Sequence, residues 1–115
     1  MTNNPMAAQR FAAAFDVDFR EGSSAMDVLK AARDMVHLGY RLRTHPVTSG
    51  TAPDGNPFMS VVVTAEAGPM DFDSVSIIEG AVGLYVKLGK IRELPQAALD
   101  DFMLINCEML AKGGW

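Results

Sequence analysis

One histidine lies where a side chain could transfer protons. His45 follows an expected strand at 41–43 and lies in a long polar loop that extends to residue 57. An imidazole with an ordinary pKa suits general acid and base chemistry near neutral pH. Ser49 and Ser60 could act as nucleophiles, but each would need His45 as its base and an acid to orient that base. The sequence shows no such arrangement, so the catalytic residues stay unassigned, and the simpler interpretation is that His45 hydrogen-bonds its own loop.

Polar residues gather in three segments, at 2–4, 21–24 and 44–57. Asn4 and Ser24 are typical helix starts, where free N–H groups and the positive dipole end attract carboxylates and phosphates. The candidate ligand-binding residues come from these segments and the strands beside them: Asn3, Asn4, Ser23, Ser24, Arg43, Thr44, His45, Ser49, Asn56 and Ser60. The alternative is that these polar side chains only cap their own helices.

The composition argues against several other kinds of site. Two histidines, His37 and His45, and one cysteine, Cys107, predict no metal site and no intrachain disulfide. His37 is expected to interact with the end of its helix, and Cys107 to pack inside one. The chain has no dinucleotide-binding or phosphate-loop motif, so we expect no cofactor. Its net charge of −4 and pI near 5.0 argue against a nucleic-acid partner.

Helices and short strands must position the candidate residues. The expected helices start at capping or proline positions: 6–15 after Asn4, 25–38 after Ser24 and ended by Gly39, 71–88 with Asp71 or Asp73 as its cap, and a last helix opened by Pro95. Short alternating or apolar runs predict strands at 17–20, 41–43 and 60–63.

Strands that alternate with helices indicate an α/β fold. The chain of 115 residues is expected to form a single α/β domain over 1–115. The predicted architecture is a small three-layer, Rossmann-like domain with a mostly parallel sheet of three or four short strands and about four helices. In such a domain the three polar segments would meet at one edge of the sheet, where open α/β sheets bind ligands.

The third expected helix has apolar residues over a wide surface, which predicts that it is buried or forms an interface. Gly80 and Gly83 lie within it and predict the close approach of a neighbouring backbone. A homodimer through the third or fourth helix would explain the same surface. We expect no membrane association, because no apolar run approaches the ~18 residues of a membrane span. We expect a cytoplasmic location, because the chain has a single cysteine and lacks the basic segment and apolar run of a secretory signal.

Several strings in the first sixty residues resemble the GrdX family, small proteins encoded beside the glycine, sarcosine and betaine reductases. The strings are Thr2-Asn3-Asn4-Pro5, Glu21-Gly22-Ser23, Val28-Leu29, Arg33-Asp34, Val36-His37, Gly39, Arg41-Leu42, Thr44-His45-Pro46, Asn56-Pro57-Phe58 and Ser60-Val61. Their shared order is more specific than any one of them. The resemblance implies an accessory role near a selenium-dependent reductase and implies no catalytic activity.

Three function hypotheses follow. The first is an accessory protein that binds reductase components or another protein. The second is a module that binds a small anionic ligand, amino-acid-like or phosphorylated, at the polar edge. The third, with the least support, is an enzyme that uses His45.

Overall fold

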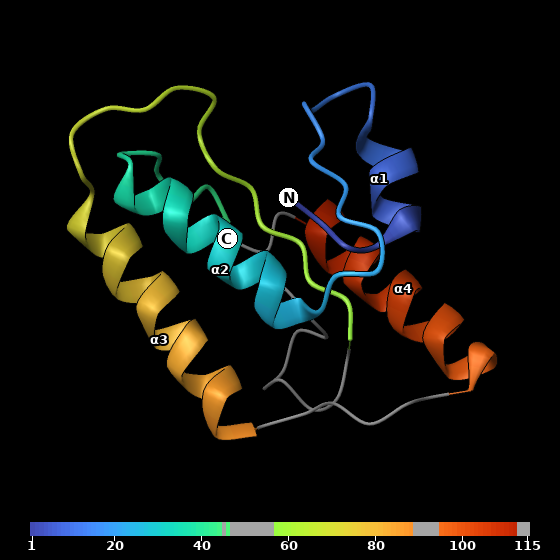
Figure 1. Ribbon diagram of the computed structural model, residues 1–115. Helices are drawn as coiled ribbons and strands as arrows, with labels where there is room; N and C mark the ends of the chain where they lie inside the picture. The colour runs from blue at the N-terminus through green and yellow to red at the C-terminus, as the bar shows by residue number, and fades with distance from the viewer. Residues whose placement is uncertain (45, 47–56, 89–94, 113–115) are drawn as a thin grey trace.

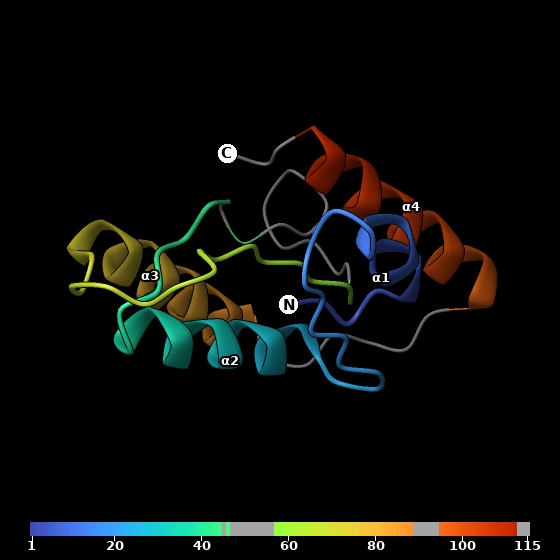
Figure 2. The ribbon, with the colours of Figure 1, turned by 90° about the horizontal axis from the view of Figure 1, so that it is seen from above.

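A computed structural model of the chain describes residues 1–44, 46, 57–88 and 95–112 (Figure 1). Four helices lie in these ranges: α1 (Pro5–Phe11), α2 (Ala25–His37), α3 (Phe72–Leu88) and α4 (Gln96–Ala111). They form two pairs, α2 with α3 and α1 with α4. Figures 1 and 2 show extended segments of the chain running between the two pairs.

The predicted Rossmann-like α/β fold is wrong. The described residues contain four helices and no strand or sheet. Extended segments are present near the expected positions, but they meet only in isolated bridges: Thr2 with Phe19 in parallel, Thr2 with Ser60 antiparallel, and Leu42 with Val63 antiparallel. The mostly parallel arrangement is therefore also wrong.

Side-chain oxygens accept hydrogen bonds from backbone N–H groups that would otherwise pair with a neighbouring strand. The bonds are Met59 N to Asn3 Oδ1 at 2.8 Å, Val62 N to Thr44 Oγ1 at 3.1 Å, Arg41 N to Thr64 Oγ1 at 3.0 Å and Leu42 N to Ser74 Oγ at 3.0 Å. Such bonds offer the backbone an alternative to pairing with a neighbouring strand. The pairing therefore stops after a single bridge at each position.

Local capping sets the limits of α1 and α2. The Oδ1 atom of Asn4 accepts the N–H groups of Met6 at 3.0 Å and Ala7 at 3.4 Å. At α2, Ser24 is the predicted N-cap, and together with Asp27 it forms a capping box. Gly39 follows α2 with a φ of 106°, so the predicted glycine stop is confirmed.

The first helix is shorter than predicted. It ends at Phe11 and does not extend to Phe15, and the N–H groups of Ala14 and Phe15 both donate to the Phe11 carbonyl in the turn that follows. The ring of Phe15 then packs edge to face against that of Phe11, with centroids 6.1 Å apart. This turn carries the chain away from α1 toward residues 16–20.

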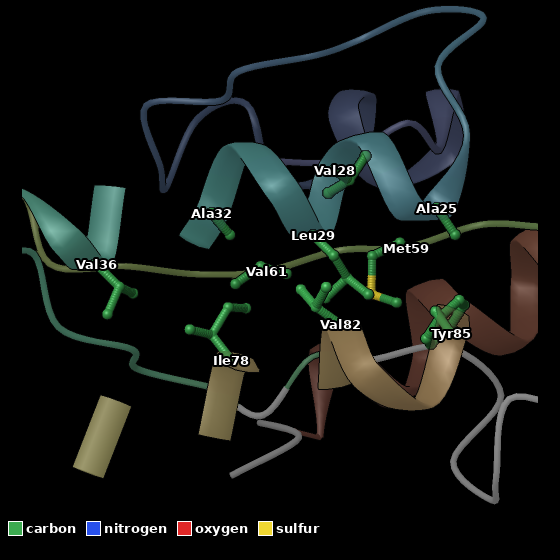
Figure 3. Close-up of a cluster of buried hydrophobic side chains, with 10 residues drawn as sticks. All are labelled: Ala25, Val28, Leu29, Ala32, Val36, Met59, Val61, Ile78, Val82 and Tyr85. Carbon is green, nitrogen blue, oxygen red and sulfur yellow. The ribbon is translucent and has the colours of Figure 1, made fainter. Parts of the chain in front are cut away.

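The main apolar core lies between α2, α3 and the extended segment that follows residue 57. Figure 3 shows its side chains: Ala25, Val28, Leu29, Ala32 and Val36 from α2, Met59 and Val61 from the extended segment, and Ile78, Val82 and Tyr85 from α3. Burial of these apolar surfaces is the main force that holds α2 and α3 together.

Asp71 is the residue that caps α3. Its Oδ2 atom accepts the Ser74 hydroxyl at 2.5 Å and the Ser74 N–H at 3.1 Å. The hydroxyl bond is the main reason that the pKa of Asp71 lies below its ordinary value of 3.8. The ionised carboxylate therefore stabilises the fold above the pKa of the unfolded chain, and this contribution is lost as pH falls through the lower folded pKa.

Asp71→Asn is expected to destabilise the protein at pH 6 by an amount that shrinks as the pH falls below about 4. Urea unfolding of both proteins at pH 6, 4 and 3 would measure this difference. Ser74→Ala, which removes the hydroxyl that lowers the pKa, is expected to show the same trend. If the difference in the free energy of unfolding stayed constant from pH 6 to pH 3, the ionised Asp71 carboxylate would not be the stabilising group.

Within the ranges that the structure describes, no neighbouring backbone approaches Gly80 or Gly83, so the predicted close approach is not found there. A Cβ atom built at either position meets nothing within 4 Å, and both residues are exposed on α3. Glycine in an exposed helix position costs roughly 0.5–1 kcal/mol relative to alanine. Gly80→Ala and Gly83→Ala are each expected to raise the free energy of unfolding by about that amount in urea titrations. A fall in stability would show instead that this face is covered in solution.

Candidate functional site

Four buried polar side chains form a connected hydrogen-bond network between the extended segments and α4. The Ser60 hydroxyl donates to Asn106 Oδ1 at 2.8 Å, so its oxygen is left to accept the Thr2 hydroxyl, also at 2.8 Å. The Thr2 oxygen in turn accepts the Asn4 N–H at 3.0 Å. Asn4 Nδ2 donates to Asn106 Oδ1 at 3.1 Å and to the Met103 carbonyl at 2.9 Å. The network joins the start of α1 to the middle of α4.

Asn3 connects three segments of the chain. Its Nδ2 atom donates to the carbonyls of Ser23 and Pro57, both at 2.9 Å, and its Oδ1 atom accepts the Met59 N–H. The side-chain bonding groups of Asn3 are therefore used within the protein. The same is true of Asn4, whose oxygen caps α1 and whose nitrogen makes the two bonds to α4.

The structure brings together part of the predicted polar edge. Asn3, Asn4 and Ser60 lie close to one another, and Ser23 joins them through its carbonyl. Ser24 caps α2, and the Thr44 hydroxyl accepts the Val62 N–H. Arg43 is exposed beside a hollow. His45, Ser49 and Asn56 lie outside the described residues. Ligand binding by these residues stays a prediction.

A hollow of about 850 Å³ lies between α1, α2 and the extended segments. One wall is a stripe on α2 at the i, i+3, i+4, i+7 spacing of a helix face: Ala31, Asp34, Met35 and Leu38. The opposite wall contains Phe11 and Phe15, with Leu110 of α4. Phe15 on one wall is 44% exposed and Leu38 on the other is 69% exposed, so the hollow presents apolar surface to solvent.

Charged side chains also line the hollow. Arg20 and Asp18 pair with each other at 3.0 Å. Asp16, Asp34 and Arg43 line it too, and their side chains have no ionic or hydrogen-bonding partner within the part of the chain that the structure describes. Within the described ranges the hollow therefore combines apolar walls with two carboxylates and one guanidinium that are not used by another described residue.

The sequence analysis missed two features of this region. Asn106 is fully buried in the network, and an asparagine among the apolar residues of the last helix was the available signal. The stripe of α2 on the hollow was missed because the core stripe on the same helix explained its periodicity. A second apolar stripe, at residues 31, 35 and 38, could have been predicted from their helical spacing.

The remaining reactive side chains lie apart from one another. The Nε2 atom of His37, the last residue of α2, lies 3.0 Å from Glu79 Oε1 on α3. Cys107 is fully buried on α4, where Arg10 donates to its Sγ atom at 3.7 Å. Among the described residues, no group of three or more His, Cys, Asp and Glu side chains could hold a metal ion. No helix in those ranges is long and apolar enough to cross a membrane.

A comparison with models of known protein families shows to which family the chain is related. The model of the family described as GrdX-like protein matches residues 1–113. The chain belongs to the GrdX family. The resemblance found in the first sixty residues is thus confirmed and extends over nearly all of this GrdX-like chain. Searches of curated proteins and of solved structures gave no match to it.

Proposed function

We propose that this GrdX-family chain is an accessory protein of the glycine, sarcosine and betaine reductase system that acts by binding a partner, without catalysis of its own. The hollow between α1, α2 and the extended segments carries the proposal. Its volume of about 850 Å³ suits a ligand or peptide segment, since binding sites commonly enclose about 300–1,000 Å³. The family name supports the link to the reductase system.

The exposed apolar side chains of the hollow favour binding energetically. Leu38 and Phe15 would lose contact with water when a partner covers them, and buried apolar area contributes roughly 25 cal/mol per Å². Well-packed apolar and aromatic side chains at the centre of an interface commonly dominate its affinity. The carboxylates of Asp16 and Asp34, which have no ionic partner among the described residues, would then select partners by charge.

A binding experiment with purified reductase components tests the proposal. We expect one component to co-elute with the protein in size-exclusion chromatography. Leu38→Lys in the hollow should weaken this association at least about tenfold, equivalent to about 1.4 kcal/mol. Val86→Lys on α3 is the matched control, because Val86 is 65% exposed and lies outside the hollow.

The outcomes separate the possible interfaces. Loss of association only with Leu38→Lys supports binding through the hollow. Loss only with Val86→Lys moves the interface to α3, where the sequence predicts a homodimer surface. No association of the unmodified protein with any component would overturn the proposed accessory role.

A small anionic ligand is the second candidate, and Arg43 is the observation that favours it. Its guanidinium lines the hollow without an ionic partner among the described residues. A thermal-shift screen with glycine, sarcosine, betaine, acetyl phosphate and common nucleotides tests this candidate, because a ligand of the native state raises the midpoint. Arg43→Gln should abolish the shift. If no compound raises the midpoint of thermal unfolding near millimolar concentration, the small-ligand candidate is wrong for these compounds.

A further inference from the structure

The outer face of α3 exposes apolar side chains on the side turned away from the core. The inner face packs on α2 through residues such as Ile78 and Tyr85, and Figure 1 shows α3 at the edge of the molecule with α2 beside it. On the outer face Phe72 is 77% exposed, Val86 65% and Leu84 46%. Exposed apolar side chains that gather on one face are typical of a protein–protein contact.

Small residues form the middle of this outer face. Ser76, Gly80 and Gly83 follow one another at spacings of four and three residues, and all three are exposed. Glycine lowers the stability of a helix, but it also allows another backbone to come close. Within the described ranges no backbone uses the space at Gly80 or Gly83. A second helix that packed on this face could lie in that space.

Two opposite charges lie at the ends of the same face. Asp73 is seven residues before Gly80 and Lys87 is seven residues after it, so the three form one line along the helix, since seven residues make almost two turns. Both charged side chains are exposed, and neither has an ionic or hydrogen-bonding partner in the part of the chain that the structure describes. The line is opposite the buried residues of α3.

This charge pattern is complementary to itself in the reverse direction. In an antiparallel pair of α3 helices with a two-fold axis at Gly80, residues equally far before and after Gly80 face each other. Asp73 of each copy would then face Lys87 of the other copy, which gives two ion pairs. At the common crossing angle of about 20° the helix ends stay close enough for a lysine side chain to reach. A parallel pair would place like charges together instead.

The apolar flanks of the face match in the same arrangement. By helical spacing, Phe72 and Val86 lie on one side of the central line, and the partly exposed Ile77 and Leu84 lie on the other. The two-fold axis brings each flank against the same flank of the second copy. Phe72 would therefore approach Val86 of the other chain, and Ile77 would approach Leu84. Apolar surface meets apolar surface on both sides.

We propose that the outer face of α3 binds the same face of a second copy of this chain, with the two helices antiparallel and Gly80 at their crossing point. The 17 residues of α3 form a helix about 25 Å long and about 10 Å wide, so the total buried area is below about 1,200 Å². Interfaces of this size are weak, and we expect a dissociation constant of about 10–100 µM. This face is separate from the hollow, so the inference does not depend on the function proposed above.

Sedimentation velocity of the full chain at about 1 to 500 µM, in a buffer of low ionic strength, tests the inference. We expect the unmodified protein to change from monomer to dimer over this range. Asp73→Lys and Lys87→Asp each replace both attractive pairs by repulsive pairs, so each should weaken the dimer at least about tenfold. Lys30→Asp is the matched control, because it changes the net charge as much as Lys87→Asp but at an exposed position of α2, and it should leave the dimer unchanged.

An equal mixture of the Asp73→Lys and Lys87→Asp chains tests the antiparallel arrangement. In a mixed dimer, lysine faces aspartate at both ends of the helix pair. The mixture should therefore associate at least about tenfold more tightly than either variant alone. A mixture that associates no better than its components would overturn the inference, as would an unmodified protein that stays monomeric over the whole concentration range.

Gly80→Glu separates dimer formation from folding. At about 1 µM, where the dimer is dissociated, this substitution should stabilise the chain, because glutamate favours a helix more than glycine and a Cβ atom at Gly80 meets nothing within 4 Å. The alanine substitutions at Gly80 and Gly83 should stabilise the monomer in the same way. In the dimer, Gly80→Glu places two bulky like charges at the crossing point, so it should weaken association at least about tenfold. Unchanged association would show that the helices do not cross at Gly80 and would overturn the inference.

Discussion

Replacing Asn4 with alanine is expected to lower the free energy of unfolding by about 2–4 kcal/mol. The substitution removes the α1 cap, which contributes roughly 1 kcal/mol in other helices. It also removes the part-buried bond to the Met103 carbonyl and one donor to the buried Asn106, at roughly 1–3 kcal/mol for buried polar groups that lose a partner. Urea unfolding followed by circular dichroism would measure the change.

Two further variants identify the source of this effect. Ser24→Ala removes an exposed cap from α2 and should cost only about 1 kcal/mol, so it separates capping from the buried network. Asn4→Asp keeps an acceptor for the α1 cap but places a carboxylate against the Met103 carbonyl and Asn106 Oδ1. It should therefore be unstable at neutral pH and recover in part as acid protonates it. If Asn4→Ala and Ser24→Ala lowered the free energy of unfolding equally, the buried network would contribute little to stability.

Gly39→Ala is expected to destabilise the protein by about 2–5 kcal/mol. At its φ of 106°, an L-residue is strained by roughly 1–3 kcal/mol. A Cβ atom there would also overlap the carbonyl oxygen of Gly68, whose N–H donates to the Gly39 carbonyl at 3.0 Å. Backbone cannot move aside as a flexible side chain would, so the turn between α2 and residues 40–43 must shift. The midpoint of thermal unfolding would report the loss.

Gly22→Ala is the matched control for this prediction. Gly22 also has a positive φ, 76°, but a Cβ atom built there meets nothing within 4 Å. It should therefore carry only the backbone strain, about 1–2 kcal/mol. If Gly39→Ala and Gly22→Ala cost the same, the approach of Gly68 to Gly39 is not important for stability.

The helices could be predicted from sequence because their signals are local. Asn4 and Pro5 start α1, the Ser24 and Asp27 pair starts α2, and Gly39 ends it. Each signal acts over three or four residues, so it can be read without knowing the fold. The end of α1 was missed because the alanines at 12–14 favour continuation, and the i, i+4 spacing of Phe11 and Phe15 is also compatible with a helix.

The strands could not be predicted correctly because their pairing is not local. Thr2 meets Phe19 and Ser60, and Leu42 meets Val63, each in a single bridge. Alternation in the sequence shows that a segment is extended, but the number of bonds it makes depends on distant side chains such as Thr44 and Ser74. These side chains take N–H groups that a ladder would need, and no local pattern reveals that competition.

The candidate site was predictable only in part, for a similar reason. Thr2 of segment 2–4 bonds to Ser60, and Asn3 of the same segment bonds to the Ser23 carbonyl of segment 21–24. The acceptors for Asn4 Nδ2 are supplied by Met103 and Asn106 near the other end of the chain, however, which no spacing rule could indicate. The hollow was not predicted at all, since its walls come from segments that are separated widely in sequence.

The bonds of Asn4 to α4 also determine when the chain can complete its structure. Asn4 and Asn106 are 102 positions apart, so their bond closes almost the longest loop that the chain can form. Long-range contacts of this kind slow folding, because the entropy of closing the loop is lost before the contact forms. During synthesis, α1 therefore emerges from the ribosome well before the helix that holds it in place. The cap of α1 is local and can form early, but the buried network can form only after translation has passed α4, so residues 2–4 are among the last to reach their final hydrogen bonding.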